Sequence, residues 1–106
     1  MAKYLIRASL SREGIQGTLK EGGVARRAAV DRLMRSVGGT LDAFYYAFGD
    51  DDLYAIVDCP DNVSVAAASL TVAAAGVGNI KTVVLLTPEE LDQVSKKTAT
   101  YRAPGT

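Results

Sequence analysis

Residues 40–58 read TLDAFYYAFGDDDLYAIVD, two strand-like segments with a turn between them. Residues 40–48 and 52–58 are rich in aromatic and branched apolar side chains, which favour strands. The intervening Gly49-Asp50-Asp51 has residue types that tolerate the backbone angles of a tight turn. The pattern predicts an antiparallel hairpin in the middle of the chain.

A helix is predicted on each side of this hairpin. Residues 24–37 carry apolar side chains at three-and-four spacing, and Gly38-Gly39 ends the segment as glycine often does past a helix. After the hairpin, Pro60-Asp61-Asn62 begins an alanine-rich helix that runs to about Ala75 and is expected to be buried. A shorter helix over residues 12–20, capped by Ser11, is predicted further upstream.

One more strand is predicted beyond each helix, at residues 3–9 and 79–86. The order strand, helix, strand, strand, helix, strand is the split βαβ pattern of the ferredoxin-like fold. We therefore predict an α+β fold, a four-stranded antiparallel sheet with helices on one face. Thr87-Pro88-Glu89-Glu90 is a helix start that adds a C-terminal helix to about Lys97. Residues 1–97 form a single domain in this scheme, and residues 98–106 form a loose tail.

Composition excludes several classes of function. Twelve basic and 12 acidic side chains cancel, whereas nucleic-acid binding needs a clustered basic excess. The apolar run at residues 63–77 is too short and too polar to span a membrane. One cysteine cannot form an intrachain disulfide, and a strand pattern begins directly after Met1 without a signal peptide. These features predict a cytoplasmic protein that binds neither nucleic acid nor membrane.

Apolar side chains on both faces of the sheet predict a homo-oligomer. Strict alternation would put Tyr45 on one face of its strand and Phe44, Tyr46 and Phe48 on the other. The last strand is apolar on both sides as well. A wet face of an antiparallel sheet is normally polar, so the face without helices needs a cover. A second copy packed face to face, most simply in a dimer, would supply it. The sequence leaves open which set of side chains faces the helices.

The side chains of common catalytic and metal sites are missing. There is no histidine, so a His-containing triad and a His/Cys metal site are excluded. Asp50, Asp51 and Asp52 offer oxygen ligands for a divalent cation, but no twelve-residue loop with a closing glutamate surrounds them. A solvated turn is the favoured interpretation. No metal and no cofactor are predicted.

Five residues are candidates for binding a small ligand. Arg26 and Arg27 follow Gly22-Gly23 at the start of a helix, where anions are favoured; the alternative is surface ion pairing with Glu21 or Asp31. Arg7, Tyr45 and Tyr46 lie within strands and would line a cavity if the open sheet face formed one. The alternative for these three is a core between two subunits.

Several segments in order resemble the GYD domain family over roughly residues 3–97. They are Tyr4-Leu5-Ile6-Arg7-Ala8, Glu21-Gly22-Gly23, Arg26-Arg27, Gly38-Gly39, Ala43-Phe44-Tyr45, Ala47-Phe48-Gly49 and Leu85-Leu86-Thr87-Pro88-Glu89-Glu90. The resemblance implies a small bacterial protein of uncharacterised function, with a fold of the dimeric α/β-barrel type. That group includes cofactor-free monooxygenases and small-molecule sensing domains. The chain departs from the family's glycine, variable residue, tyrosine, aspartate pattern, because Asp51 stands at the tyrosine position.

Two functions from different classes remain. The first is a homo-oligomeric small-molecule-binding or assembly module without catalysis, indicated by the missing catalytic groups and the tyrosine-rich sheet. The second is a cofactor-independent, monooxygenase-like enzyme for a small aromatic substrate. A closed pocket with convergent polar groups would favour the second function, and a C-terminal helix covering the open sheet face would contradict the first.

Overall fold

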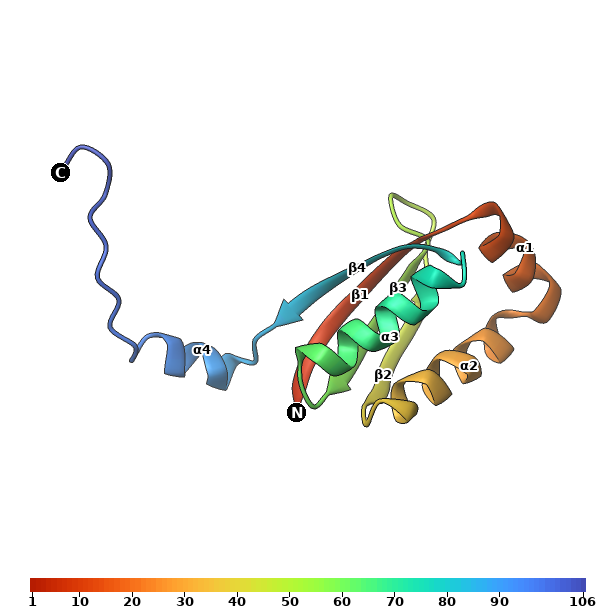
Figure 1. Ribbon diagram of the computed structural model, residues 1–106, viewed down its shortest axis with the longest axis horizontal. Coiled ribbons are helices and arrows are strands. Elements are labelled where there is room, and N and C mark those ends of the chain that lie inside the picture. Colours follow the sequence, from red (N-terminus) through yellow and green to blue (C-terminus); the bar gives the residue numbers. More distant parts are fainter.

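Four strands and four helices follow one another along residues 1–106 of the computed structural model (Figure 1). They are β1 (Ala2–Leu10), α1 (Arg12–Glu21), α2 (Gly23–Ser36), β2 (Thr40–Tyr46), β3 (Leu53–Cys59), α3 (Asn62–Ala74), β4 (Gly78–Leu85) and α4 (Pro88–Val94). Every predicted element is present in the predicted order. Most bounds differ by only one or two residues, but α4 ends at Val94 rather than near Lys97.

The strands form one antiparallel sheet in the order β2-β3-β1-β4. Each βαβ crossover therefore skips one strand, and the predicted ferredoxin-like topology is confirmed. Helices α1, α2 and α3 lie on one side of the sheet, as Figure 1 shows. Alternation in β1 sends Tyr4 and Ala8 toward these helices, and both are buried.

The core lies between the central strands and the two long helices. Tyr4, Val57 and Cys59 from the sheet pack with side chains from α2 and α3, namely Met34, Val65 and Ala68. Tyr4 donates a 2.6 Å hydrogen bond to Asn62 Oδ1, so its hydroxyl has a partner. At this end the packing is tight, because a Cβ on Gly39 would overlap the carbonyl oxygen of Asp58 and lie 2.9 Å from Cys59 Sγ.

Side-chain caps fix where the helices begin. The Ser11 hydroxyl accepts from Gly14 N at 3.0 Å before α1, and the Asp61 carboxylate accepts from Ser64 N at 2.9 Å before α3. Thr87 and Glu90 form the predicted capping box of α4. Between α1 and α2 the chain turns at Gly22, whose φ of 92° favours glycine.

The side chains of β2 do not alternate strictly as expected, because the strand contains a β-bulge. The pairing with β3 shifts between Leu41 and Ala43, so Leu41 lies opposite Val57 while Phe44 lies opposite Ala55. Both β3 partners are buried on the helix side. Strict alternation, which placed Leu41 and Phe44 on opposite faces, was therefore wrong, because the extra residue of a bulge reverses the parity of the strand beyond it.

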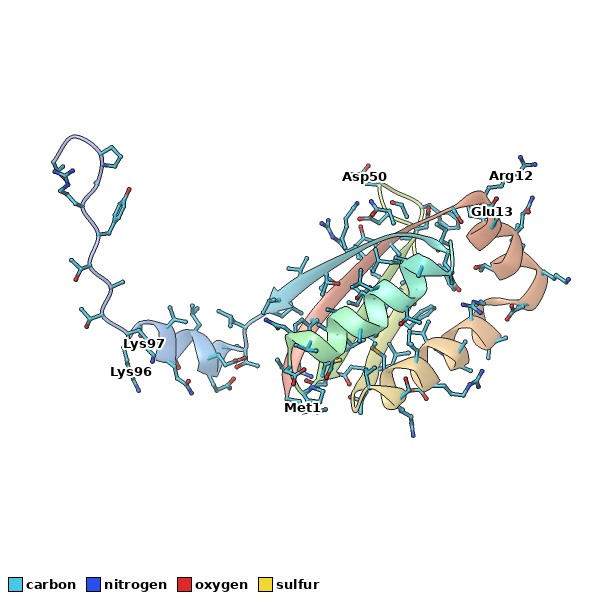
Figure 2. The ribbon with its side chains drawn as sticks, viewed as in Figure 1. Met1, Arg12, Glu13, Asp50, Lys96 and Lys97 are labelled. Carbon is cyan, nitrogen blue, oxygen red and sulfur yellow. The ribbon has the colours of Figure 1, made fainter.

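Two apolar segments are less covered than the sequence predicted. In α3 only Val65 and Ala68 are buried, whereas Val63 and Leu70 are exposed, so the expectation of a buried helix holds for one side only. Residues 86–106, which we call the C-terminal arm, extend away from the sheet (Figure 1). Helix α4 makes no extensive contact with any other element, and Lys96 and Lys97 lie far from the sheet in Figure 2.

Candidate functional site

An apolar cavity of about 130 Å³ lies between the sheet and helices α1, α2 and α3. Sixteen of its 19 lining residues are hydrophobic. The hydrophobic ones come from all four strands, from α2 and α3, and from the chain between α3 and β4, with Ile6, Phe44, Ala55 and Ile80 among the sheet residues and Ala29, Leu33 and Val72 among the helix residues. Helix α1 contributes only Thr18. An apolar cavity of about 150 Å³ stays dry and can bind benzene, so this one has room for a small ring.

The polar residues of the lining are few. Arg26 is its one charged residue, Thr18 and Ser69 are the other two polar residues, and Tyr46 brings a hydroxyl from β2. The ring of Tyr46 packs edge-on against Phe44 at a centroid separation of 5.4 Å. A Cβ on Gly23 would lie 3.2 Å from Tyr46 Cε2. The missing side chain at Gly23 thus allows the tyrosine ring to approach the first turn of α2, one turn before Arg26.

Hydrogen bonding leaves the arginine and the tyrosine available to a ligand. Arg26 Nη1 lies 3.6 Å from Glu21 Oε2, a distance longer than a hydrogen bond, and no side-chain hydrogen bond to Tyr46 occurs in the chain. By contrast, the Thr18 hydroxyl already donates to the Gly14 carbonyl oxygen at 2.8 Å. Arg26 and Tyr46 thus line the cavity and also reach solvent, with 31% of the Arg26 side chain and 39% of Tyr46 exposed.

The five candidate residues do not form one site. Arg26 and Tyr46 line the cavity, whereas Arg27 and Tyr45 line a separate groove between α2 and the edge strand β2. Arg7 lies on the opposite face of the sheet, because its neighbours Ile6 and Ala8 in β1 both line the cavity. Only the pair in the cavity is brought together by three covering helices and the sheet.

The sheet face away from the helices, which we call the open face, carries a continuous apolar row. Leu5 in β1 lies opposite Ile56 on one side and Val83 on the other, and Ile56 lies opposite Ala43. One row further along, Tyr45 and Tyr54 are paired and Arg7 and Lys81 follow. The chain's own C-terminal helix does not cover this face.

Charged side chains flanking the apolar row are paired within the chain. Lys3 Nζ lies 2.8 Å from Asp42 Oδ2 and 2.7 Å from Asp58 Oδ2. These hydrogen bonds raise the pKa of Lys3 and lower the pKa of Asp42. At the other end Arg7 Nη1 lies 3.7 Å from Asp51 Oδ2, and Arg7 Nε is buried without a partner. The open face is thus nearly neutral around its apolar centre.

The hairpin loop contradicts the expectation of a solvated turn. Only 1% of Asp51 is exposed. Its carboxylate accepts hydrogen bonds from Lys81 Nζ at 2.8 Å and from Ser9 Oγ at 3.0 Å. The bond from Lys81 is the main cause that holds the pKa of Asp51 below its usual range. Asp52 Oδ2 accepts from Leu10 N at 2.8 Å, whereas Asp50 is exposed at the loop tip in Figure 2. Two of the three aspartates therefore fasten the loop to β1 and β4.

Sequence reasoning missed most of the cavity lining. Ala29, Ala55 and Ala68 are small residues at central positions of α2, β3 and α3, and they leave space where larger side chains would meet. Small side chains that face one another between the sheet and the helices could have predicted the cavity. They can be recognised only when it is known which side chains of each strand face the helices. Because the bulge in β2 alters that parity, Tyr46 could not be assigned to the cavity beforehand.

Comparison with known proteins supports the resemblance seen in the sequence. The family model of the GYD domain matches residues 4–94. The chain belongs to the GYD domain family. The match spans the sheet, helices α1 to α3 and α4, and it includes both the cavity and the open face. No curated protein matches the chain. No helix is both long enough and apolar enough to cross a membrane.

Within this GYD domain, Asp51 in the hairpin loop has a clear structural role. Its carboxylate is the acceptor that joins Ser9 of β1 and Lys81 of β4. The loop lies on the open-face side of the sheet, away from the cavity lining.

Proposed function

We propose that this GYD domain is a homo-oligomeric module that binds a small molecule in the cavity between the sheet and its helices. The observation that carries the proposal is the cavity itself, about 130 Å³ of largely apolar space with Arg26 and Tyr46 in its lining. Ligand sites are typically concave and apolar with a few placed polar groups. The groove between α2 and β2 is less apolar, because three of its nine lining residues, Arg27, Asp31 and Asp42, are charged.

The lining favours binding without catalysis over an enzyme. The lining contains no carboxylate, histidine or cysteine. Apart from the hydroxyls of serine and threonine, its side chains that can donate a proton or a hydrogen bond are those of Arg26 and Tyr46. A monooxygenase-like reaction needs a group that takes a proton from the substrate. The Tyr46 hydroxyl would have to serve that purpose in the enzyme alternative, with Arg26 as its nearest charged neighbour in the lining.

Self-association through the open face is the second half of the proposal. The row Ala43, Ile56, Leu5 and Val83 crosses all four strands, and paired charges border it. Neutral, apolar surface of this kind favours a second copy of the same face. Tyr45 and Arg7 belong to this face and would contact the partner. The exposed apolar side of α3 and the side chains Leu91 and Val94 of the C-terminal arm add surface that an oligomer would cover.

A cavity-filling variant tests ligand binding directly. Ala29 lines the cavity from α2, so Ala29→Leu fills part of it, whereas Ala25→Leu adds the same side chain at an exposed position of the same helix. Benzene is the probe, and amide chemical shifts of the isotope-labelled protein report its binding. We expect benzene to shift amides of cavity residues in the wild type and in Ala25→Leu, with binding weakened at least about tenfold in Ala29→Leu.

Two results would contradict the proposal. One is an absence of benzene-induced shifts in the wild type up to its aqueous solubility. The other is equal binding by Ala29→Leu and the wild type, which would place the probe elsewhere. A thermal-shift screen then extends the test to other molecules, since a ligand that binds only the folded state raises the melting temperature with its occupancy. We place this binding in the bacterial cytoplasm, in keeping with the single, buried, unpaired cysteine.

A further inference from the structure

We infer that the cavity selects a small monoanion: an apolar body of about one six-membered ring that carries a single carboxylate or comparable acidic group. This inference rests on the proposed function and adds the chemical class of the ligand. It assigns Arg26 as the residue that recognises the anion, with Tyr46 as a second donor. The three observations behind it are the charge of the lining, the state of the arginine's hydrogen bonds, and the volume.

The charge of the lining is a single positive one. Among the 19 lining residues Arg26 is the only charged side chain. Glu21, which balances it, lies outside the lining on the last turn of α1 and is half exposed. A cationic ligand would meet this arginine without any acidic partner in the cavity, so like-charge repulsion excludes it. A neutral ligand would leave the arginine unused, whereas an anion gains a charge-assisted hydrogen bond.

The arginine is poised to change partners. At 3.6 Å from Glu21 the contact is an ion pair without a hydrogen bond, and the Arg26 side chain is 31% exposed. Pairs of this exposure contribute little to stability, so replacing Glu21 by a ligand carboxylate costs little. The planar guanidinium binds a carboxylate through two parallel hydrogen bonds. The Tyr46 hydroxyl, without a partner in the chain, can donate a third.

The volume limits the apolar part. A space of about 130 Å³ is slightly smaller than the roughly 150 Å³ that holds benzene in another protein. One ring or a branched chain of similar size therefore fits among Leu33, Ala55 and Val72.

Matched probes test separately whether the cavity binds a small molecule and whether it prefers an anion. Benzoate, benzyl alcohol and benzylamine share a ring and differ in charge, and benzene serves as the neutral reference. Titration by calorimetry or by amide shifts gives the dissociation constants. We expect benzoate to bind most tightly and benzylamine not at all. Glu21→Gln should tighten benzoate binding, because it removes the competing carboxylate.

Two arginine variants identify the residue responsible. Arg26→Gln should weaken benzoate binding at least about tenfold while changing the affinity for benzene less than about twofold. Arg32→Gln removes the same charge from an exposed position of α2 outside the cavity and should change neither. Melting temperatures of both variants, together with retained benzene binding, verify that the fold and the cavity are intact.

Each outcome tests either the inferred ligand class or the proposed binding in the cavity. If benzene binds but benzoate binds no more tightly than benzyl alcohol, or if Arg26→Gln and Arg32→Gln affect benzoate equally, the inference about the ligand class is overturned and cavity binding stands. If benzylamine binds most tightly, the cavity selects a cation and the inferred anionic ligand class is wrong. If none of the four probes binds, the proposed function fails together with the inference.

Discussion

The two faces of the sheet differ in whether their polar side chains have hydrogen-bond partners within the chain. On the helix face, the apolar cavity lining includes Arg26 and Tyr46, which are partly exposed and make no side-chain hydrogen bond within the chain. On the open face, most charges are neutralised within the chain, and the apolar residues Leu5, Ile56 and Val83 lie between them. An apolar cavity with a few polar residues in its lining favours a small ligand, whereas a neutral apolar surface favours another protein surface.

The same strands serve both purposes because side chains alternate along them. In β1, Ile6 and Ala8 line the cavity while Leu5 and Arg7 lie on the open face. Neighbouring residues can therefore change independently, and a substitution on one face should leave the other largely as it is. Three substitutions examine this separation, beginning with the one expected to have the largest effect.

Leu5→Asp should abolish self-association and leave the fold intact. Leu5 is central in the apolar row of the open face, so a carboxylate there would be buried without a partner between two copies. We expect the wild type to sediment at low micromolar concentration as a species heavier than 11.2 kDa, and the variant to associate on the order of 100-fold more weakly. Leu19→Asp, at an exposed position of α1, is the matched control. A wild-type protein that sediments at the monomer mass would contradict the interface.

Gly39→Ala should destabilise the helix face at its tightly packed end. The added Cβ would overlap the backbone carbonyl oxygen of Asp58 and approach Sγ of Cys59, which is completely buried. We expect the melting temperature to fall by roughly 10 °C. Gly17→Ala is the control, since a Cβ there meets nothing within 4 Å and alanine is the better helix former. Equal melting temperatures for Gly39→Ala and the wild type would show that this end is not closely packed.

Asp51→Asn should reduce the loss of stability in acid. The bonds from Lys81 and Ser9 and the nearby Arg7 hold the pKa of Asp51 below its ordinary value. The ionised carboxylate therefore stabilises the fold fully above about pH 4, and this stabilisation disappears as the pH falls through the lowered pKa. We expect the wild type to be more stable than Asp51→Asn at pH 7, with the difference shrinking in that acid range. Asp50→Asn, at the exposed loop tip, should follow the wild-type curve; parallel curves for all three would contradict the role of Asp51.

The sequence predicts the fold well because its strongest signals are local. The apolar stripe before Gly38, the turn at Gly49 and the capping residues Asp61 and Thr87 each depend on neighbours a few residues away. Together they define the element order, and the element order restricts the topology to very few arrangements. The same local signals predicted too long a helix at the C-terminus. Helix α4 ends at Val94, and the residues that follow it are exposed and have no packing partner.

The candidate site could be predicted only in part, since it depends on contacts between distant residues. Arg26 and Tyr46 were among the candidates, but nothing local relates position 26 to position 46. The bulge in β2 arises where Leu41 and Ala43 pair with β3, and it decides which tyrosine faces the helices. Asp51 was assigned to solvent because three consecutive aspartates resemble a solvated turn, while its partners Ser9 and Lys81 lie on other strands.

The C-terminal arm has a consequence for the hydrodynamic behaviour of the chain. The radius of gyration is 16.8 Å and the longest extent is 57 Å, whereas a rounded domain of about 100 residues has a radius of gyration near 13 Å. A single chain with the arm extended therefore diffuses like a heavier particle, and gel filtration alone would count it as more than one copy. Mass-sensitive methods such as sedimentation equilibrium or light scattering separate shape from stoichiometry.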